Sequence, residues 1–516
     1  MATISTAVGL DRISRVTGYN IKKGFFSRET QNLPQIIAIF GEANTANQSG
    51  LSVNKVEVTS AAQAASLYGY GSPIHRMVSI LRPSGSDGVG GIPTVVFPQV
   101  TSGGATATVR AWTVTGTATA NATHTFVING RYSVDFASYS YDVAIGDTAT
   151  VIAAKIATAI NAVLSSPCTA SSALGVVTIT SKWKGTTSAE LFLTVDYGTN
   201  AAGISYAQTS TTNGAGSVSL DTSLSQFGDD WYTMVLNPYG EAHLATFEAF
   251  NGLPNDVNPT GRYSGLIFKP FCAYFGSVLS DKTALATITN NVSRIPQVTN
   301  VICVAPNSKG FTFEAAANVV ALASVVYQNT PHLDVTGLSY PDMPIPSDSV
   351  IGDFNDYNNR DFLVKKGCST VKLVNGAYEI QDLVTTYHID GEVPLLYSYP
   401  RTLNIHWNVK DSYSTLERLY LKDKTLVSDS QVIAVGDAIK PKEWKGLVSV
   451  LFDDLAENAL INDPEFSKSS LNVQISSSNP NRFETAFNYK TTGTVRVSST
   501  TATAGFGGAS SSGLGN

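Results

Sequence analysis

A long stretch of low charge, residues 101–219, interrupts a chain that otherwise alternates between strand and helix patterns. Thr, Ala, Gly and Ser dominate the stretch, and its apolar residues are spaced as in strands and helices. This regularity argues against the alternative, a low-complexity linker. We therefore predict that residues 33–100 and 220–345 form one discontinuous layered α/β domain. Residues 101–219 form a domain inserted into it.

The flanking parts carry the signals of an α/β fold. Residues 34–42 predict a buried strand, and residues 95–98 predict a second one. Between them, Ser60 begins one helix, and Ser72 with Pro73 begins another. After residue 220 the same pattern returns, with strands predicted near residues 231–236 and 301–304 and helices over 241–250 and 315–327.

The inserted stretch predicts a β-rich α+β domain. Its strands are expected at residues 106–112, 125–129, 175–180 and 191–195, and Asn129-Gly130 between strand-like runs predicts a β-hairpin. Asp147 and Thr148 begin a helix that runs to residue 164. Six residues form its predicted buried stripe: Val151, Ile152, Ile156, Ala159, Ile160 and Val163.

A third unit, residues 346–492, is predicted to be an α+β domain. A strand is expected at residues 378–384, and alternating apolar residues predict two more at 471–475 and 483–489. Helices are expected at residues 401–409 and 444–458. The proline-rich residues 331–346 predict a connector, and the acidic, Asn-rich residues 353–361 predict a loop.

Both ends of the chain are predicted to be extended arms. Residues 493–516 contain a short strand-like run, followed by Ser, Thr, Ala and Gly. A terminal strand can leave its own domain and complete a neighbour's sheet edge, and the alternative is an ordinary edge strand with a frayed end. The predicted inter-subunit strand consists of Thr494, Val495, Arg496, Val497 and Ser498. Residues 1–32 are interpreted as an N-terminal arm, with simple disorder as the alternative.

Composition argues against several classes of protein. The net charge is -6, and Lys and Arg never occur in a run longer than two, which argues against a nucleic-acid binder. The four cysteines are far apart and form no C-x-x-C pair, which suggests free thiols in a reducing compartment. No signal peptide is evident and no apolar run approaches 18 residues, so membrane insertion is not expected.

The spacings typical of catalysis and of cofactor or metal binding do not occur. There is no phosphate-binding loop, no H-E-x-x-H and no G-x-S-x-G, and Gly69 and Gly71 lack the third glycine of a dinucleotide site. His332 with Asp334 and His388 with Asp390 are spaced to share a strand face, but neither pair has a third metal ligand. We therefore predict no catalytic, cofactor-binding or metal residues. An enzyme with a dispersed site, such as a hydrolase, is the alternative.

Four segments near the C-terminus occur in an order that resembles the contractile tail sheath proteins of Mu-like phages. They are residues 383–387 (LVTTY), 418–424 (RLYLKDK), 466–473 (FSKSSLNV) and 479–482 (NPNR). A weaker resemblance lies at residues 40–42 and 67–77. The resemblance covers roughly residues 377–498 and says least about the middle of the chain.

The resemblance implies a structural subunit without enzymatic activity. Such subunits stack as rings into a helical homo-polymer around an inner tail tube, and contraction drives the tube through the host envelope during genome delivery. It implies an outward position for the insertion and a virion tail assembled in the bacterial host cytoplasm. The implied partners are the chain itself, the inner tail tube protein, and the baseplate and tail terminator proteins. The alternatives are the sheath of a phage-like contractile injection particle and a β-rich surface- or carbohydrate-binding structural protein.

The predicted helix over residues 444–458 carries a second candidate site. Glu457 follows Asp453 by four residues and Asp454 by three, so it lies beside both on the predicted helix, opposite a predicted apolar stripe. The resemblance implies that a C-terminal helix attaches the sheath to the tube, so these residues are a hypothetical tube-facing site. A solvated acidic face and a general acid/base pair are the alternatives. The predicted apolar stripe consists of Leu447, Val450, Leu451 and Leu455.

Overall fold

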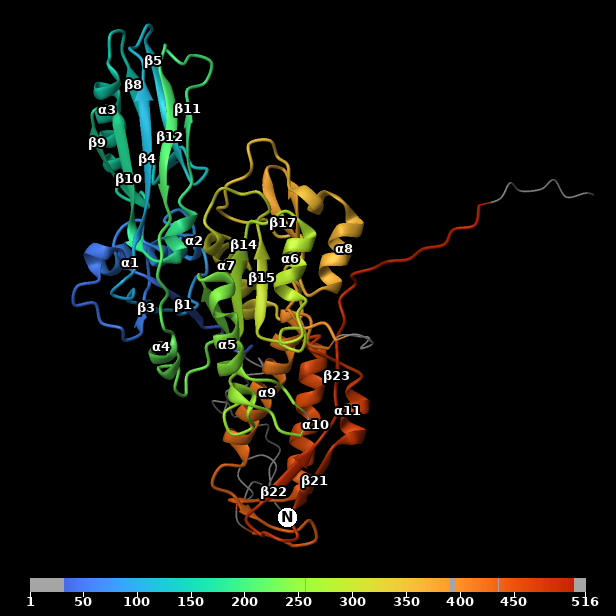
Figure 1. Cartoon of the computed structure of the whole chain (residues 1–516). Helices are drawn as coiled ribbons and strands as arrows, with labels where there is room; N and C mark the ends of the chain where they lie inside the picture. Colours follow the sequence, from blue (N-terminus) through green and yellow to red (C-terminus); the bar gives the residue numbers. More distant parts are fainter. Residues whose placement is uncertain (1–31, 256, 390–395, 435, 505–516) are drawn as a thin grey trace, which may run out of the picture.

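The computed structural model describes residues 32–255, 257–389, 396–434 and 436–504. Apart from Asn32, the predicted N-terminal arm lies outside the described residues, as do residues 505–516 of the tail. The protein is a mixed α/β structure, with strands β4–β12 at one end of the molecule and helices α9–α11 at the other (Figure 1).

A six-stranded sheet joins the parts of the chain on either side of residues 101–219. Its order is β15-β14-β13-β1-β3-β2, and all pairs are parallel except the short edge strand β2. At its centre Ile37 of β1 is opposite Thr94 of β3 on one side and Met234 of β13 on the other. The strands are β1 (Ile37–Glu42), β2 (Val56–Glu57), β3 (Thr94–Gln99), β13 (Met234–Asn237), β14 (Cys272–Ser277) and β15 (Asn300–Val304).

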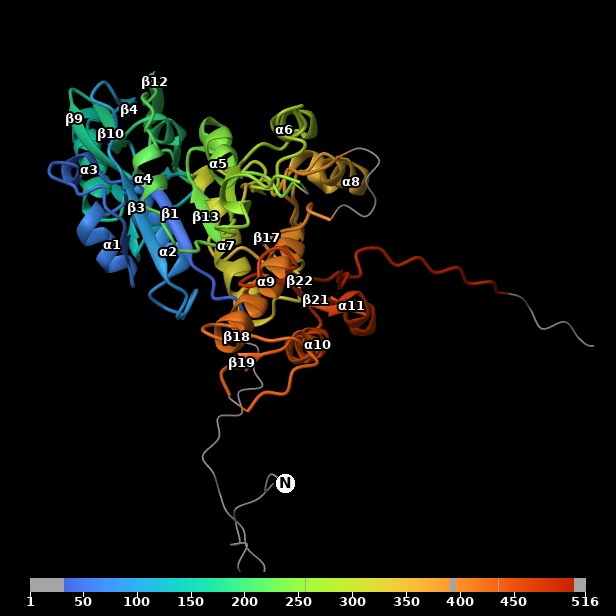
Figure 2. The ribbon, with the colours of Figure 1, turned by 90° about the horizontal axis from the view of Figure 1, so that it is seen from below.

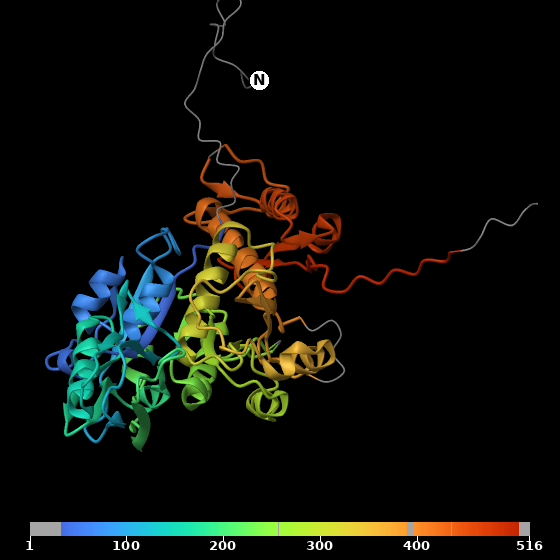
Figure 3. The same ribbon diagram turned by 90° about the horizontal axis from the view of Figure 1, so that it is seen from above.

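Both faces of this sheet are covered, as the apolar strand sequences require. Ile37 and Ile39 belong to a large core with residues of α1, α2 and α7, whereas Ala38 and Phe40 point to the other face. There Phe40 packs with Phe97, Phe227 and Phe247. Figure 3 shows α7 (yellow) near the middle of the molecule. The helices are α1 (Ala61–Tyr68), α2 (Pro73–Leu81), α4 (Asp221–Ser225), α5 (Leu244–Asn251), α6 (Lys282–Thr289) and α7 (Thr312–Asn329).

The predicted starts of the first two helices are confirmed. The Ser60 hydroxyl accepts a hydrogen bond from the Gln63 backbone N–H at 3.2 Å, and Ser72 accepts one from the His75 N–H at 3.1 Å. Each bond satisfies a backbone donor that the first turn of a helix leaves without a partner.

Residues 107–212 form two larger antiparallel sheets with a helix packed on them, and a separate two-stranded pair. One sheet has the order β12-β4-β10-β9 and the other β11-β5-β8. The turn of the predicted hairpin is confirmed, since Asn129 and Gly130 have φ of 46° and 73° and Ile128 forms a bridge with Arg131. Beyond that bridge, the strand before the turn pairs with β8 and β11 and not with the segment that directly follows the turn. The elements are β4 (Ala107–Thr115), β5 (Ala122–Ile128), β6 (Ser133–Val134), β7 (Ala137–Ser138), β8 (Ser140–Val143), α3 (Ala149–Ala162), β9 (Cys168–Ala173), β10 (Val176–Lys184), β11 (Leu193–Asp196) and β12 (Ser205–Thr212).

The C-terminal part is built around α9, α10 and α11. Trp444 and Phe452 of α10 are fully buried against Ile405 of α9 and Leu471. The tail then leaves this part of the molecule (Figure 2). The elements are α8 (Tyr357–Lys365), β16 (Thr370–Val374), β17 (Ala377–Asp382), α9 (Pro400–Tyr420), β18 (Thr425–Leu426), β19 (Ala438–Ile439), α10 (Pro441–Glu457), β20 (Ile461–Asn462), α11 (Pro464–Ser470), β21 (Asn472–Ile475), β22 (Phe483–Ala486) and β23 (Lys490–Thr491).

The predictions for one loop and for the buried stripe of α3 are corrected by the structure. Residues 353–361 are not a loop, because α8 begins within them: Asp356 caps it by accepting from the Asn358 N–H at 2.8 Å, and Leu363 is buried. Val151 was expected in the buried stripe of α3 but is exposed, and Ala153 and Ala157 are buried in that stripe with Ile152, Ile156 and Ile160.

All four cysteines are free thiols, as predicted, and all four are buried. Among the described residues, no helix combines the length and the apolar character that crossing a bilayer demands.

Candidate functional site

The C-terminal tail begins at a short strand pair. Ile461 of β20 pairs with Thr491 of β23, and Asn462 with Lys490. Immediately afterwards Arg401 of α9 donates two hydrogen bonds to Thr492, at 2.9 Å to its carbonyl oxygen and 3.0 Å to its hydroxyl. The Thr492 hydroxyl in turn donates to the Ala459 carbonyl at 2.7 Å. The tail therefore starts from a fixed point on the C-terminal helices.

The predicted inter-subunit strand, residues 494–498, follows this point in an extended form. Within the described chain these residues belong to no sheet, so their backbone groups have no strand partner. Val495 and Val497 are 90% and 80% exposed, whereas Thr494 and Arg496 are half-buried. The segment thus presents an apolar side to solvent and a polar side to its own subunit. Figure 1 shows the described residues after this segment, 499–504, leading away from the body.

The hairpin of β21 and β22 offers an open edge on each side. Val473 is opposite Thr485 in this antiparallel pair, and in the described residues neither strand pairs with a third. An unpaired strand edge presents N–H and C=O groups that another chain can bind.

The acidic residues of α10 lie on its outer side. Asp453 and Asp454 are partly buried, Glu457 is exposed, and the Asp453 carboxylate forms an ion pair of 2.6 Å with Lys468 of α11. Lys468 also pairs with Glu465 at 2.8 Å. The acidic face is therefore partly neutralised by the neighbouring helix.

The predicted apolar stripe of α10 is only partly right. Leu451 and Leu455 are buried, but Val450 is 57% exposed and lies on the acidic side of the helix. Trp444, Val448 and Phe452 complete the buried side. The reason is the helical period, which places residue 450 about 100° from residue 451 and beside residues 453, 454 and 457.

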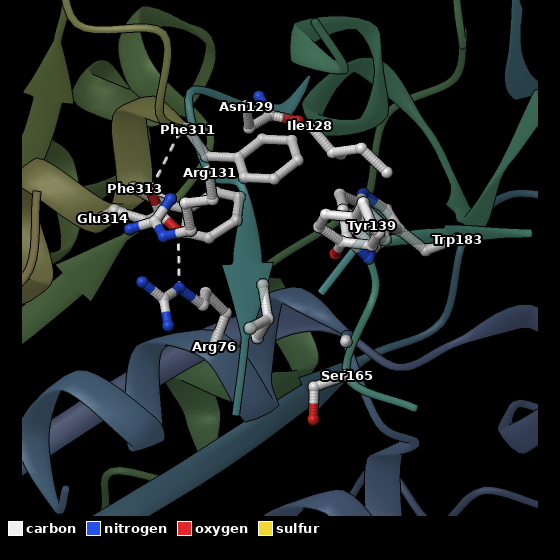
Figure 4. Close-up of a pocket in the computed structure, with 13 residues that line it drawn as sticks. Arg76, Ile128, Asn129, Arg131, Tyr139, Ser165, Trp183, Phe311, Phe313 and Glu314 are labelled. Atoms are coloured by element: carbon white, nitrogen blue, oxygen red, sulfur yellow. Dashed lines mark hydrogen bonds and ion pairs between the residues drawn. The ribbon is translucent and has the colours of Figure 1, made fainter. Parts of the chain in front are cut away.

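An ion-pair network joins the 107–212 part to the sheet. The Glu314 carboxylate, at the start of α7, accepts from Arg76 Nε at 2.6 Å and from Arg131 Nη1 at 2.9 Å. The same two guanidinium groups reach Asp342, at 2.5 and 3.3 Å. Arg131 follows the tight turn at Asn129 directly, so that turn aims it at α7. Figure 4 shows the side chains of Arg76 and Arg131 close to that of Glu314.

A small cavity of about 30 Å³ lies beside this network, lined by Tyr139, Trp183 and Phe311 among others. It has room for about two water molecules. A ligand of ordinary size does not fit there, so we assign the network a structural role.

Two more carboxylates form hydrogen bonds between the 107–212 part and the rest of the chain. Glu190, which ends the short 3-10 helix Thr186–Glu190, accepts from the N–H and the hydroxyl of Thr312, both at 2.7 Å, at the first turn of α7. Glu42 at the end of β1 accepts from the Thr187 hydroxyl at 3.2 Å. Burial raises the pKa of Glu42 and of Glu190 to about 7.

This burial predicts a pH dependence of stability. The ordinary pKa of Glu42 is 4.5, so its folded state binds a proton more tightly than its unfolded state. Its contribution is fully present below pH 4.5 and is lost as pH rises through about 7. Glu42→Gln should therefore stabilise the protein at pH 8 by on the order of 1–3 kcal/mol and change little near pH 5.

Urea unfolding of the two proteins from pH 5 to pH 8 measures this difference. Glu241→Gln is the control, because Glu241 is exposed and carries the same change in charge. Parallel stability curves for Glu42→Gln and the parent chain would show that the Glu42 carboxyl does not titrate as described.

Of the two histidine–aspartate pairs predicted as weak metal candidates, His332 with Asp334 belongs to no metal cluster of the described residues. The carboxylate of Asp334 binds Arg496, and the ring of His388 contacts the Thr386 carbonyl and Asn290. Asp390 lies outside the described residues. No cluster of three or more His, Cys, Asp or Glu side chains with metal-binding geometry occurs in the described parts of the chain.

Comparisons with known proteins agree with the resemblance found in the sequence. No protein-family model matches the chain. It is 27% identical over 458 residues to the Mu-like prophage FluMu tail sheath protein of Haemophilus influenzae, an alignment that covers 86% of this chain and 87% of the relative. The predicted resemblance to Mu-like tail sheath proteins is thereby confirmed, and it extends well beyond the C-terminal region.

Two solved structures are also similar. The sheath tail protein of Desulfitobacterium hafniense matches with a TM-score of 0.43 and 11% identity, over 92% of this chain and 100% of that one. The helical sheath of the anti-feeding prophage in its contracted state matches with a TM-score of 0.45 and 8% identity, over 95% and 99%.

Proposed function

We propose that this chain, which resembles a Mu-like tail sheath protein over most of its length, is the structural subunit of a contractile tail sheath. It polymerises around an inner tail tube and contracts to drive the tube through the host envelope during genome delivery. The observation that carries this proposal is the 27% identity to the FluMu sheath protein over 458 residues. The role is mechanical, and we assign no catalytic step to the chain.

Sedimentation velocity of the purified chain tests self-assembly. The expected result is a concentration-dependent conversion of the 54.6 kDa monomer into very large particles. A chain that remains monomeric at all concentrations and ionic strengths would contradict the proposal.

The architecture we propose is a layered α/β sheath domain of residues 33–100 and 220–345, interrupted by an outer α+β domain of residues 101–219. Residues 346–492 form the C-terminal sheath domain, and residues 1–32 and 493–516 form the linking arms. The pairing of β1 with both β3 and β13 supports this division, because it joins strands from both sides of the interruption. The position of the 101–219 unit at one end of the molecule supports an outward orientation (Figure 1).

We propose that subunits are linked by strand addition. The strand is residues 494–498, and the receiving edge is the β21–β22 hairpin of a neighbouring subunit. Three observations support this pairing: the free backbone groups of the segment, its exposed Val495 and Val497, and the open edges of the hairpin. On pairing, the two valines would be covered by the neighbour, which adds apolar burial to the new backbone hydrogen bonds.

Strand linkages that stay paired during contraction would keep the polymer in one piece. Rigid-body movement of subunits between two packings is a recognised kind of transition, and a barrier between them stores free energy until release. In this proposal the linking strands stay paired while the bodies of the subunits move.

The remaining partners follow from the same proposal. The inner tail tube protein lies inside the polymer, and the baseplate and tail terminator proteins lie at its two ends. The chain is placed in the virion tail after assembly in the bacterial host cytoplasm.

We propose that the acidic face of α10 meets the tube. Replacing Asp453, Asp454 and Glu457 by lysine should abolish co-sedimentation with the tube protein while sheath self-assembly persists, because the attraction to complementary charge becomes repulsion. The helix itself should survive, since cations near a helix C-terminus interact favourably with its dipole.

Glu465→Lys is the matched control, because Glu465 is an exposed acid on the neighbouring α11 and not on α10. Unchanged co-sedimentation of the triple variant would remove α10 from the tube contact. Loss of co-sedimentation in both variants would point to general charge repulsion instead.

A further inference from the structure

The side chain of Arg496 holds the first residues of the tail against their own subunit, through contacts with three separate segments of the chain. Its guanidinium binds the Asp334 carboxylate, in the segment after α7, and the Asp382 carboxylate at the end of β17, the latter at 3.2 Å. It also lies 3.8 Å from the centre of the Tyr399 ring, immediately before α9. A planar guanidinium suits such a site, because it can bind two carboxylates in its plane and an aromatic ring on its face.

These contacts are well shielded from water for a segment close to a chain end. The side chains of Arg496, Asp334 and Asp382 are 22%, 12% and 30% exposed. Together with Thr492, Arg496 fixes the tail at two points four residues apart, and no hydrogen bond or ion pair joins residues 497–504 to another described residue. Arg496 is thus the last anchor before the tail leaves the body.

The anchor leaves the tail able to pair. It uses only the Arg496 side chain, so the backbone groups of residues 494–498 remain free. Because successive side chains of an extended segment point to opposite sides, holding Arg496 inward also turns Val495 and Val497 outward.

We propose that Arg496 is a positioning residue that sets the direction in which the tail leaves its own subunit, and thereby the neighbouring copy on which it can add a strand. This inference rests on the proposed function. The physical gain is preorganisation: a tail fixed at residue 496 searches a smaller volume than one fixed only at residue 492, so its effective concentration at the receiving edge is higher.

Polymerisation measured by light scattering tests the inference. Arg496→Ala should raise the critical concentration by about tenfold or more. The body-side double variant Asp334→Asn/Asp382→Asn should reproduce this rise, because it removes both carboxylates of the anchor and leaves the tail unchanged. Arg496→Lys should give an intermediate value, since an ammonium keeps the charge and loses the two-sided geometry. Lys365→Ala, which breaks an exposed ion pair with Asp361 and removes no contact of Arg496, is the control.

The monomer supplies a second readout. A fluorophore on Ala502→Cys labels the tail selectively, since the four native cysteines are buried. Below the critical concentration, its anisotropy should be lower in Arg496→Ala and in the double variant than in the parent chain, while the melting temperature changes little.

Two results would overturn the inference while the proposed function stands. One is an unchanged critical concentration in Arg496→Ala. The other is a raised critical concentration in Arg496→Ala but not in Asp334→Asn/Asp382→Asn, because Arg496 would then act on the neighbour. A parent chain that never polymerises would overturn the proposed function itself, and this inference with it.

Discussion

Removal of residues 493–516 is expected to produce a folded monomer that no longer polymerises. The deletion removes the proposed linking strand, including the exposed Val495 and Val497, and leaves β23 and the Arg401–Thr492 hydrogen bonds in place. Without a strand to donate, each subunit loses the backbone hydrogen bonds and the apolar burial that join it to the next.

The monomer should be nearly as stable as the parent chain. The described part of the deleted segment contributes one half-buried guanidinium with its two ion pairs and its contact with Tyr399. Their loss is expected to cost about 1–2 kcal/mol. Circular dichroism and urea unfolding check the fold, and light scattering checks polymerisation.

Mixing distinguishes a lost linkage from a damaged fold. The truncated subunit keeps its β21–β22 edges, so it can accept a tail but cannot donate one. Added to the parent chain in small amounts, it should shorten the polymers in proportion to its share. Polymers of normal length made from the truncated protein alone would contradict strand linkage.

Glu314→Gln is expected to be the most destabilising single substitution in the boundary between the 107–212 part and the sheet. The Glu314 side chain is 1% exposed, and its carboxylate accepts from Arg76, from Arg131 and from the Phe311 N–H. An uncharged amide leaves two partly buried guanidinium groups with Asp342 as their remaining carboxylate. Removing one partner of a buried ion pair lowers the free energy of unfolding by about 3–5 kcal/mol.

Asp342→Asn is the matched control, because it removes a carboxylate from the same network at a side chain that is 48% exposed. Its expected cost is about 1 kcal/mol or less. Urea unfolding gives both values, and hydrogen exchange should rise around residues 129–131 and 310–314 in Glu314→Gln. Equal, small effects of the two substitutions would show that the network does not hold the 107–212 part to the sheet.

The sequence predicts the helices, strands and turns of this fold better than it predicts the side-chain contacts between them. Apolar spacing locates β1 and α2, serine caps locate two helix starts, and Asn129-Gly130 locates a turn, because each signal is local. Helix α8 was missed because its polar sequence buries few apolar side chains, and Val450 was misplaced because one residue on a helix changes the side by about 100°.

The contacts that hold the 107–212 part to the rest of the chain could not be predicted in this way. Glu42, Arg76, Arg131, Glu190 and Glu314 come from five separate segments and meet only in the folded chain. The same holds for the tail: strand-like alternation indicates residues 494–498, but the carboxylates that hold Arg496 lie 114 and 162 residues earlier.

Electron microscopy of the purified full-length chain tests the central claim most directly, since that claim is that the protein works as a contractile polymer. The predicted result is striated tubes that occur in two states, one longer and narrower and one shorter and wider. Single particles of monomer size under every condition would contradict it.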